Sequence, residues 1–201
     1  MEVYLIRHGE SEGNVLGVFQ GWADYGLSER GRTQALMAKA RLKGVRLDRI
    51  YASDTARAAE TAGLVFPDDK GRILFTRELR ETGCGCLDEL TPAQAEGRYG
   101  SLYSEREDGW DFRPFGGEHA CDMEKRVVGF LKALEAECPG MERIAVVTHF
   151  GPIAAMLAYV LKADFRTVCS RLELYNCSIS IIKHGGSGWR VAAVNIADHL
   201  G

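Results

Sequence analysis

Short apolar runs alternate along the chain with longer stretches in which apolar residues recur every three or four positions. The run at 142–149 is the most apolar, as in a strand that is buried on both faces. The pattern predicts strands at 3–7, 48–53, 72–76, 142–149, 171–176, 178–184 and 189–195, and helices at 28–42, 54–65, 91–99 and 151–161. This alternation favours a three-layer α/β/α sandwich with a mostly parallel central sheet that ends in a hairpin.

Residues at the ends of the predicted helices support these boundaries. Ser28 has the position of an N-cap, Gly44 follows the end of the same helix, and Pro67 closes the next helix. Asp54 is interpreted as the residue that caps this next helix. The alternative for Asp54 is a carboxylate at the rim of a site.

Between residues 78 and 118 the pattern weakens, and the stretch is rich in Gly, Glu, Arg and aromatic residues. The chain shows no repeat and no linker, so we expect one domain over 1–201 with this stretch as a small inserted cap subdomain. Long excursions from an α/β core often cover an active site. The following aromatic residues supply either an apolar wall of that site or the core of the subdomain: Tyr99, Tyr103, Trp110, Phe112 and Phe115.

Composition excludes some classes of partner. The 201 residues are 46% hydrophobic and 26% charged with a net charge of −3, so neither nucleic acid nor an anionic membrane is expected as a partner. No signal peptide or spanning helix is recognisable, and the six scattered cysteines are typical of reduced thiols, so we expect a cytoplasmic protein. Cys84 and Cys86 form a close pair, but this is a weak zinc signal, and no metal site is predicted.

Arginine and histidine side chains gather where the predicted strands end. Arg7 and His8 follow the first strand. Arg57 lies in the first turn of the helix after the second strand, and His149 ends the strand at 142–149. Ligands of open α/β sheets bind beyond the carboxyl ends of the strands, so these side chains are expected at one rim. Two arginines, two imidazoles and nearby helix N-termini make a site for a phosphate dianion.

Such a site favours a specific chemistry. The positive charges of the two arginines disfavour the imidazolium form, so one histidine can stay neutral and nucleophilic near neutral pH. Attack of its ring nitrogen on phosphorus forms a phosphohistidine, which divides one displacement into two easier ones. The leaving alcohol then needs a proton, which a carboxyl group from the inserted stretch could supply.

Five motifs of the chain closely resemble those of the histidine phosphatase superfamily, the phosphoglycerate-mutase-like proteins. They follow one another in the order found in the family: LIRHGESEGN (5–14), SDTARAAETA (53–62), LRETGCGCLDEL (79–90), GGE (116–118) and VVTHFGPI (146–153). The stretch FQGWADYGLSERGRTQA (19–35) is similar to another family pattern. The resemblance covers nearly the whole chain, and it implies the phosphoglycerate-mutase-like fold.

The resemblance also implies roles for individual residues. His8 would accept the phosphate, Arg7, Arg57 and His149 would complete the phosphate pocket, and Glu81 would be the general acid and base. The residues expected to contact the phosphate or the rest of the substrate are Asn14, Gln20, Gly21 and Phe150. Members of the family use neither a metal nor an organic cofactor, so no cofactor is expected.

Two departures from the family pattern leave alternatives open. Many members have Ser-Pro before the second arginine, whereas this chain has Ser53 and Asp54. Many members have Trp-Glu-Gly after the acid, and the different sequence here makes Asp88 and Glu89 competitors of Glu81.

Three functions are compatible with this site. We favour a phosphatase that acts on a small phosphorylated metabolite, because the insertion has no adjacent pair of arginines and many acidic residues. A phosphoglycerate mutase is the alternative, and a catalytically silent binding module is the third. A homodimer through an edge strand or the C-terminal hairpin is left open.

Overall fold

The computed structural model describes residues 1–106, 108–138, 140–186 and 188–201. Its six-stranded sheet has the order β3-β2-β4-β1-β5-β6. β1, β2, β3 and β4 pair in parallel, whereas β5 runs antiparallel to both β1 and β6. The strand bounds are β1 (Glu2–Arg7), β2 (Arg49–Ser53), β3 (Ile73–Thr76), β4 (Arg143–Thr148), β5 (Ile179–Gly185) and β6 (Gly188–Ile196).

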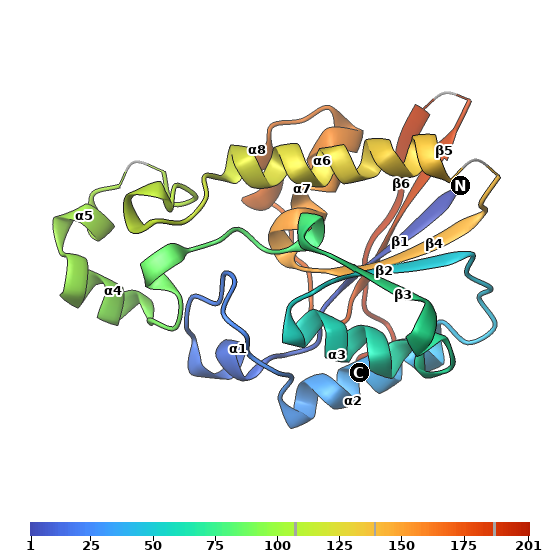
Figure 1. Ribbon diagram of the computed structural model, residues 1–201, viewed down its shortest axis with the longest axis horizontal. Helices are drawn as coiled ribbons and strands as arrows, with labels where there is room; N and C mark the ends of the chain where they lie inside the picture. Colours follow the sequence, from blue (N-terminus) through green and yellow to red (C-terminus); the bar gives the residue numbers. More distant parts are fainter. Residues whose placement is uncertain (107, 139, 187) are drawn as a thin grey trace.

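Helices cover both faces of the sheet, as Figure 1 shows. α2 (Glu29–Arg41) and α3 (Ala56–Val65) pack on one face, and α6 (Ala120–Glu137), α7 (Phe150–Leu161) and α8 (Phe165–Cys169) pack on the other. The central strand β4 separates two cores, because Ile144 and Val146 join the α6–α7 cluster whereas Ala145 and Val147 join the α2–α3 cluster. The predicted three-layer α/β/α sandwich, with its mostly parallel sheet, is therefore confirmed.

The inserted stretch between β3 and α6 carries short helices and a small core of its own. Figure 1 shows α4 (Pro92–Tyr99) and α5 (Ser101–Ser104) standing away from the sheet. A buried cluster holds this part together: Cys84, Leu87, Ala95, Phe112 and Phe115. The remaining short elements are α1 (Glu12–Leu16), η1 (Pro67–Arg72), η2 (Arg77–Leu79), η3 (Gly85–Leu87) and η4 (Arg113–Phe115).

One sequence prediction about secondary structure is wrong, and one long helix is missing from the predicted elements. The stretch 171–176 forms no strand, because its polar groups are used at the site edge: the carbonyl of Leu174 accepts from Arg7, and Asn176 donates to the carbonyl of His8 at 3.0 Å. The longest helix, α6, was not predicted at all. Its apolar positions Met123, Val127 and Leu134 do recur at helical spacing, but its N-cap is His119 rather than a typical capping residue.

The helices α1, α5 and α8 were also not predicted; they have five, four and five residues. Such segments are too short for a periodic apolar pattern to emerge. In the parts of the chain that the structure describes, no helix combines the length and the apolar character needed to cross a membrane.

Candidate active site

The carboxyl ends of β1 and β4 open onto a pocket of about 310 Å³ between the sandwich and the insertion. β1 ends at Arg7 and β4 at Thr148, and their parallel pairing places the next residues, His8 and His149, side by side with ring centroids 5.1 Å apart. All nine residues that the sequence assigns to the site line this pocket: Arg7, His8, Asn14, Gln20, Gly21, Arg57, Glu81, His149 and Phe150.

His8 uses one ring nitrogen for orientation. Its Nδ1 donates to the carbonyl oxygen of Gly9 at 2.7 Å, because a carbonyl can only accept. The neutral ring therefore keeps its lone pair on Nε2. Burial lowers the pKa of His8 well below its ordinary value, and the charges of Arg57 and Arg7 lower that pKa further. A neutral and oriented imidazole has the properties of a nucleophile.

Arg57 and Arg7 are buried guanidinium groups held by backbone carbonyls. Arg57 is 1% exposed and donates from Nη1 to Ala23 and from Nη2 to Gly21, both at 2.9 Å. Arg7 donates from Nη1 to the carbonyl of Leu174. Since these carbonyls carry no full charge, both side chains retain a positive charge that an anion can neutralise.

His149 is the N-cap residue of α7 and faces the start of α3. Its Nε2 lies 3.0 Å from the hydroxyl of Ser53 and 3.3 Å from that of Thr55. Burial lowers the pKa of His149 well below its ordinary value, and the charge of Arg57 adds to the shift. Both histidines of the pocket are therefore neutral near neutral pH.

Three buried nitrogen atoms of residues that line the pocket have no hydrogen-bond partner among the described residues. They are Nε of Arg7, Nε of Arg57 and Nδ1 of His149. An unpaired buried polar group costs roughly 1–3 kcal/mol, so three of them beside one cavity indicate a ligand that pairs with them. A phosphate dianion has the charge and the number of oxygen atoms to do so.

Glu81 brings a carboxylate to the same pocket. Its Oε1 accepts from the backbone N–H of Thr82 at 2.9 Å, and its Oε2 accepts from that of Gly151 at 3.0 Å. Gly151 is the second residue of α7, so the carboxylate lies against the N-terminus of that helix. The contact needs glycine, because a Cβ on Gly151 would lie 2.2 Å from Oε1 of Glu81.

The two competing carboxylates have other surroundings. Asp88 does not line the pocket; it lies behind Gly21 and accepts from the backbone N–H of Trp22 at 3.3 Å. Burial raises the pKa of Asp88 to about 6. Glu89 is exposed and also lies outside the pocket lining. The geometry thus favours Glu81 over both.

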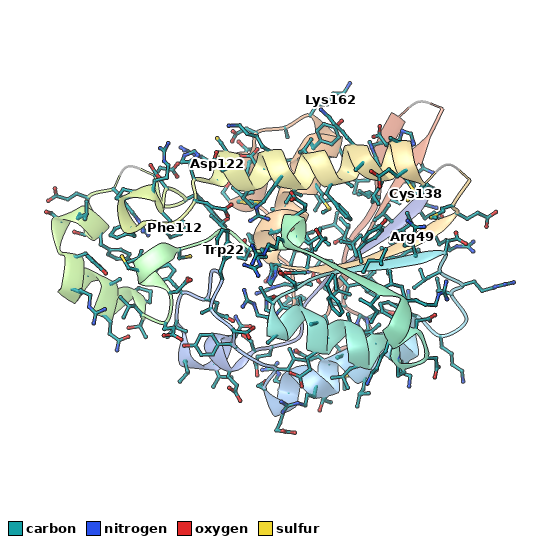
Figure 2. The ribbon with its side chains drawn as sticks, in the orientation of Figure 1. Trp22, Arg49, Phe112, Asp122, Cys138 and Lys162 are labelled. Carbon is teal, nitrogen blue, oxygen red and sulfur yellow. The ribbon has the colours of Figure 1, made fainter. Side chains whose placement is uncertain are left out.

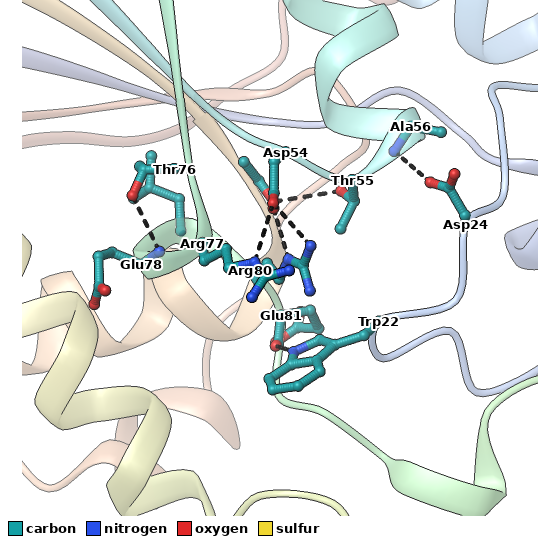
Figure 3. Close-up of polar contacts among 12 residues, drawn as sticks. Trp22, Asp24, Asp54, Thr55, Ala56, Thr76, Arg77, Glu78, Arg80 and Glu81 are labelled. Carbon is teal, nitrogen blue, oxygen red and sulfur yellow. Dashed lines mark hydrogen bonds and ion pairs between the residues drawn. The ribbon is translucent and has the colours of Figure 1, made fainter.

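Asp54 does not cap α3, so the preferred interpretation of this residue was wrong. Thr55 is the N-cap residue, and the carboxylate of Asp24 accepts from the backbone N–H of Ala56 at 2.8 Å. Figure 3 shows Asp54 in a bidentate pair with Arg80, at 2.6 and 2.8 Å. This ion pair stabilises the segment that carries Glu81.

Aromatic side chains form an apolar wall of the pocket. Phe19, Trp110, Phe112 and Phe150 contribute rings to it. Figure 2 shows Phe112 on the insertion, beside the sandwich. The other three aromatic residues of the insertion contribute mainly to the core of this part: Tyr99, Tyr103 and Phe115. Both readings of the aromatic residues are therefore partly correct.

Ser11 holds two amide side chains that line the pocket, those of Gln20 and Asn14. Its hydroxyl donates to Oε1 of Gln20 at 2.6 Å, and its backbone N–H donates to Oδ1 of Asn14 at 3.1 Å. Ser11 caps α1, so this short helix fixes both amide side chains at the pocket rim.

The sequence did not predict the two residues that donate hydrogen bonds to the backbone carbonyl of Glu81. Trp22 Nε1 and Arg126 Nη2 donate to the carbonyl oxygen of Glu81 at 2.9 and 2.8 Å. Trp22 lies within a recognisable motif, but Arg126 lies on α6 and shows no signal of its own in the sequence.

No group of three or more His, Cys, Asp or Glu side chains within 1–106, 108–138, 140–186 and 188–201 is arranged to hold a metal ion. Cys84 is buried in the pocket wall, and burial raises the pKa of its thiol, whereas Cys86 is exposed.

Comparisons with known proteins identify the family of this chain. The family model described as histidine phosphatase superfamily (branch 1) matches residues 3–197. The chain is 30% identical to a protein of Cronobacter sakazakii named "Probable phosphoglycerate mutase GpmB", over all of this chain and 95% of that protein.

Two solved structures have the same fold. The alpha-ribazole phosphatase from Shigella flexneri superposes with a TM-score of 0.89 at 26% identity, over 97% of this chain and 96% of that one. A mycobacterial glucosyl-3-phosphoglycerate phosphatase, solved with VO3, has a TM-score of 0.83 at 32% identity, over 96% of this chain and 98% of that one. The chain therefore belongs to the histidine phosphatase superfamily.

Proposed function

We propose that this protein is a phosphatase that hydrolyses small phosphomonoesters through a phosphohistidine on His8. Membership of the family supports a hydrolase or phosphotransferase role. The observation that carries the proposal is the set of three buried, unpartnered nitrogens on Arg7, Arg57 and His149, residues that line one pocket together with His8. They match a phosphoryl group placed for attack by Nε2.

The first step forms the bond between Nε2 of His8 and phosphorus and breaks the bond between phosphorus and the alcohol oxygen. Glu81, as the carboxylic acid, gives its proton to that oxygen, and the alcohol leaves neutral. Arg7, Arg57 and His149 stabilise the charge on the equatorial oxygens during transfer.

The second step reverses these roles. A water molecule attacks phosphorus, and the carboxylate of Glu81 takes its proton. The bond between phosphorus and Nε2 breaks, so His8 returns neutral and inorganic phosphate leaves. The site needs no other reactant.

Hydrolysis is favoured over phosphoglycerate mutation by the charges of the insertion. Arg113 forms a bidentate pair with Asp111, and the guanidinium of Arg106 lies over the rings of Tyr103 and Phe112. Among the described residues that line the pocket, the only guanidinium or ammonium groups are those of the phosphate site. A second anionic group on the substrate would therefore lack a cation, whereas an apolar alcohol would meet the aromatic wall.

The test is hydrolysis of p-nitrophenyl phosphate with and without a chelator, followed by incubation with 3-phosphoglycerate. The proposal expects metal-independent turnover, and release of phosphate without formation of 2-phosphoglycerate. Turnover that a chelator abolishes would contradict the mechanism. Formation of 2-phosphoglycerate would instead support the mutase, and absence of turnover would support the binding module. A cytoplasmic location and a small phosphorylated metabolite as partner belong to the same proposal.

A further inference from the structure

Arg126 of α6 reaches the segment that carries Glu81 and is not itself part of the pocket lining. Its Nη1 donates to the carbonyl of Glu78 at 2.9 Å and to that of Arg80 at 2.6 Å, and its Nη2 donates to that of Glu81 at 2.8 Å. One guanidinium thus binds three carbonyls within four consecutive residues.

A carboxylate fixes this guanidinium from the other side. Glu118 accepts from Nη2 of Arg126 at 2.9 Å, and both side chains are largely buried, at 15% and 17% exposure. Glu118 also accepts from the backbone N–H of Gly83 at 3.0 Å and donates its own N–H to the carbonyl of Gly83 at 2.8 Å. The pair of Arg126 and Glu118 therefore holds the chain on both sides of Glu81.

This part of the chain has little regular structure to hold it. The turn η2 ends at Leu79, and the next element, η3, begins at Gly85, so no helix or ladder fixes Glu81. The carboxylate has hydrogen bonds only to the N–H groups of Thr82 and Gly151 among the described residues. Its placement in the pocket depends on where the backbone of Glu81 lies.

We infer that Arg126 is a positioning residue for the proton donor of the reaction. It acts through the backbone of Glu81, whose carbonyl also accepts from Trp22 (Figure 3). The inference rests on the proposed role of Glu81. Arg126 touches neither the phosphate pocket nor the leaving alcohol, so its loss should misplace the acid and leave phosphate binding intact.

The experiment compares kcat/KM for two substrates, benzyl phosphate and 2,4-dinitrophenyl phosphate, in wild type and Arg126→Met. An alkoxide needs a proton in order to leave, whereas dinitrophenolate does not. We expect kcat/KM for benzyl phosphate to fall about 100-fold and that for dinitrophenyl phosphate to fall by less than about 5-fold, within the range known for general acids. Inhibition by vanadate should stay within about 3-fold, because the phosphate pocket is unchanged.

Two further variants keep the test decisive if Arg126→Met folds poorly. Arg126→Lys retains the charge and one or two of the bonds, and should restore part of the rate on benzyl phosphate. Trp22→Phe removes one donor to the same carbonyl from a side chain that is 46% exposed, and should shift the ratio of the two substrates in the same direction. Lys125→Met, on the exposed side of α6, is the matched control and should change neither rate.

A double-mutant cycle links the effect to the acid. In a Glu81→Gln background, Arg126→Met should leave the ratio of the two substrates unchanged, because the proton donor is already gone. An equal loss on both substrates in Arg126→Met, or an undiminished effect in the Glu81→Gln background, would overturn the inference while the phosphatase stands. A wild type with no turnover on dinitrophenyl phosphate would overturn the proposed function and this inference together.

Discussion

Gly151→Ala should damage proton donation although it removes no charged group of the site. The added Cβ would lie 2.2 Å from Oε1 of Glu81, whereas an ordinary carbon–oxygen contact is about 3.2 Å or more. Backbone atoms of α7 cannot yield, so the carboxylate must move by about 1 Å. A displacement of this size at a reacting group costs about 100-fold in rate. The other near neighbour, Met123, is at 3.4 Å and can stay in place.

The assay is kcat/KM for benzyl phosphate and for 2,4-dinitrophenyl phosphate. We expect a loss of about 100-fold for the first and less than about 5-fold for the second. The free energy of unfolding should change by less than about 1 kcal/mol, because the gain in helix propensity of alanine over glycine offsets the weakened hydrogen bond between Gly151 N–H and Glu81. The control is Gly129→Ala in α6, where a Cβ meets nothing within 4 Å. Equal losses on both substrates, or no loss at all, would refute the placement of the acid against α7.

Three further outcomes follow from the same structure. Asp88→Asn should raise the free energy of unfolding by about 1 kcal/mol at pH 7 and should not raise it at pH 4. Burial raises the pKa of Asp88 to about 6, so at pH 7 the folded protein holds a charged carboxylate that burial disfavours, and the neutral amide removes this cost. The figure allows for solvent screening of the partly exposed carboxyl. Denaturant titrations at the two pH values measure it, and an equal gain at both would contradict it. Asp24→Ala should cost about 1 kcal/mol in the same titrations, since it removes the bond that caps α3, and an unchanged midpoint would count against that cap. The ring of His8 should show no protonation between pH 8 and pH 6 in NMR spectra, because burial and two arginines hold its pKa well below 6.5; a midpoint near 6.5 would show that the ring is not buried as described.

Much of the fold could be predicted because burial leaves a local pattern. The run that became β4 is buried over five consecutive residues, so it reads as continuously apolar. Ser28 caps α2 through a bond to the N–H of Gly31, three residues along the chain, which makes such a cap visible in sequence. The stretch 171–176 has no such local pattern, because it is held by hydrogen bonds to Arg7 and His8, which lie more than 160 residues away.

The candidate site also contains residues that the sequence could predict and residues that it could not. His8 and His149 follow strands directly, so the parallel pairing of β1 and β4 is enough to bring them together. Arg126 donates a hydrogen bond to the carbonyl of Glu81, which lies 45 residues away in the sequence. Asp54 pairs with Arg80, 26 residues away, although a nearby helix start offered a local explanation. Contacts of this kind depend on the packed structure and leave no local pattern.

The central claim is that His8 accepts the phosphoryl group. The most direct measurement is rapid quenching of the protein during turnover of 2,4-dinitrophenyl phosphate, followed by mass spectrometry of the peptides under alkaline conditions. The account predicts an acid-labile phosphate on His8, and its complete loss in His8→Ala. Phosphate on another side chain, or turnover retained by His8→Ala, would contradict it.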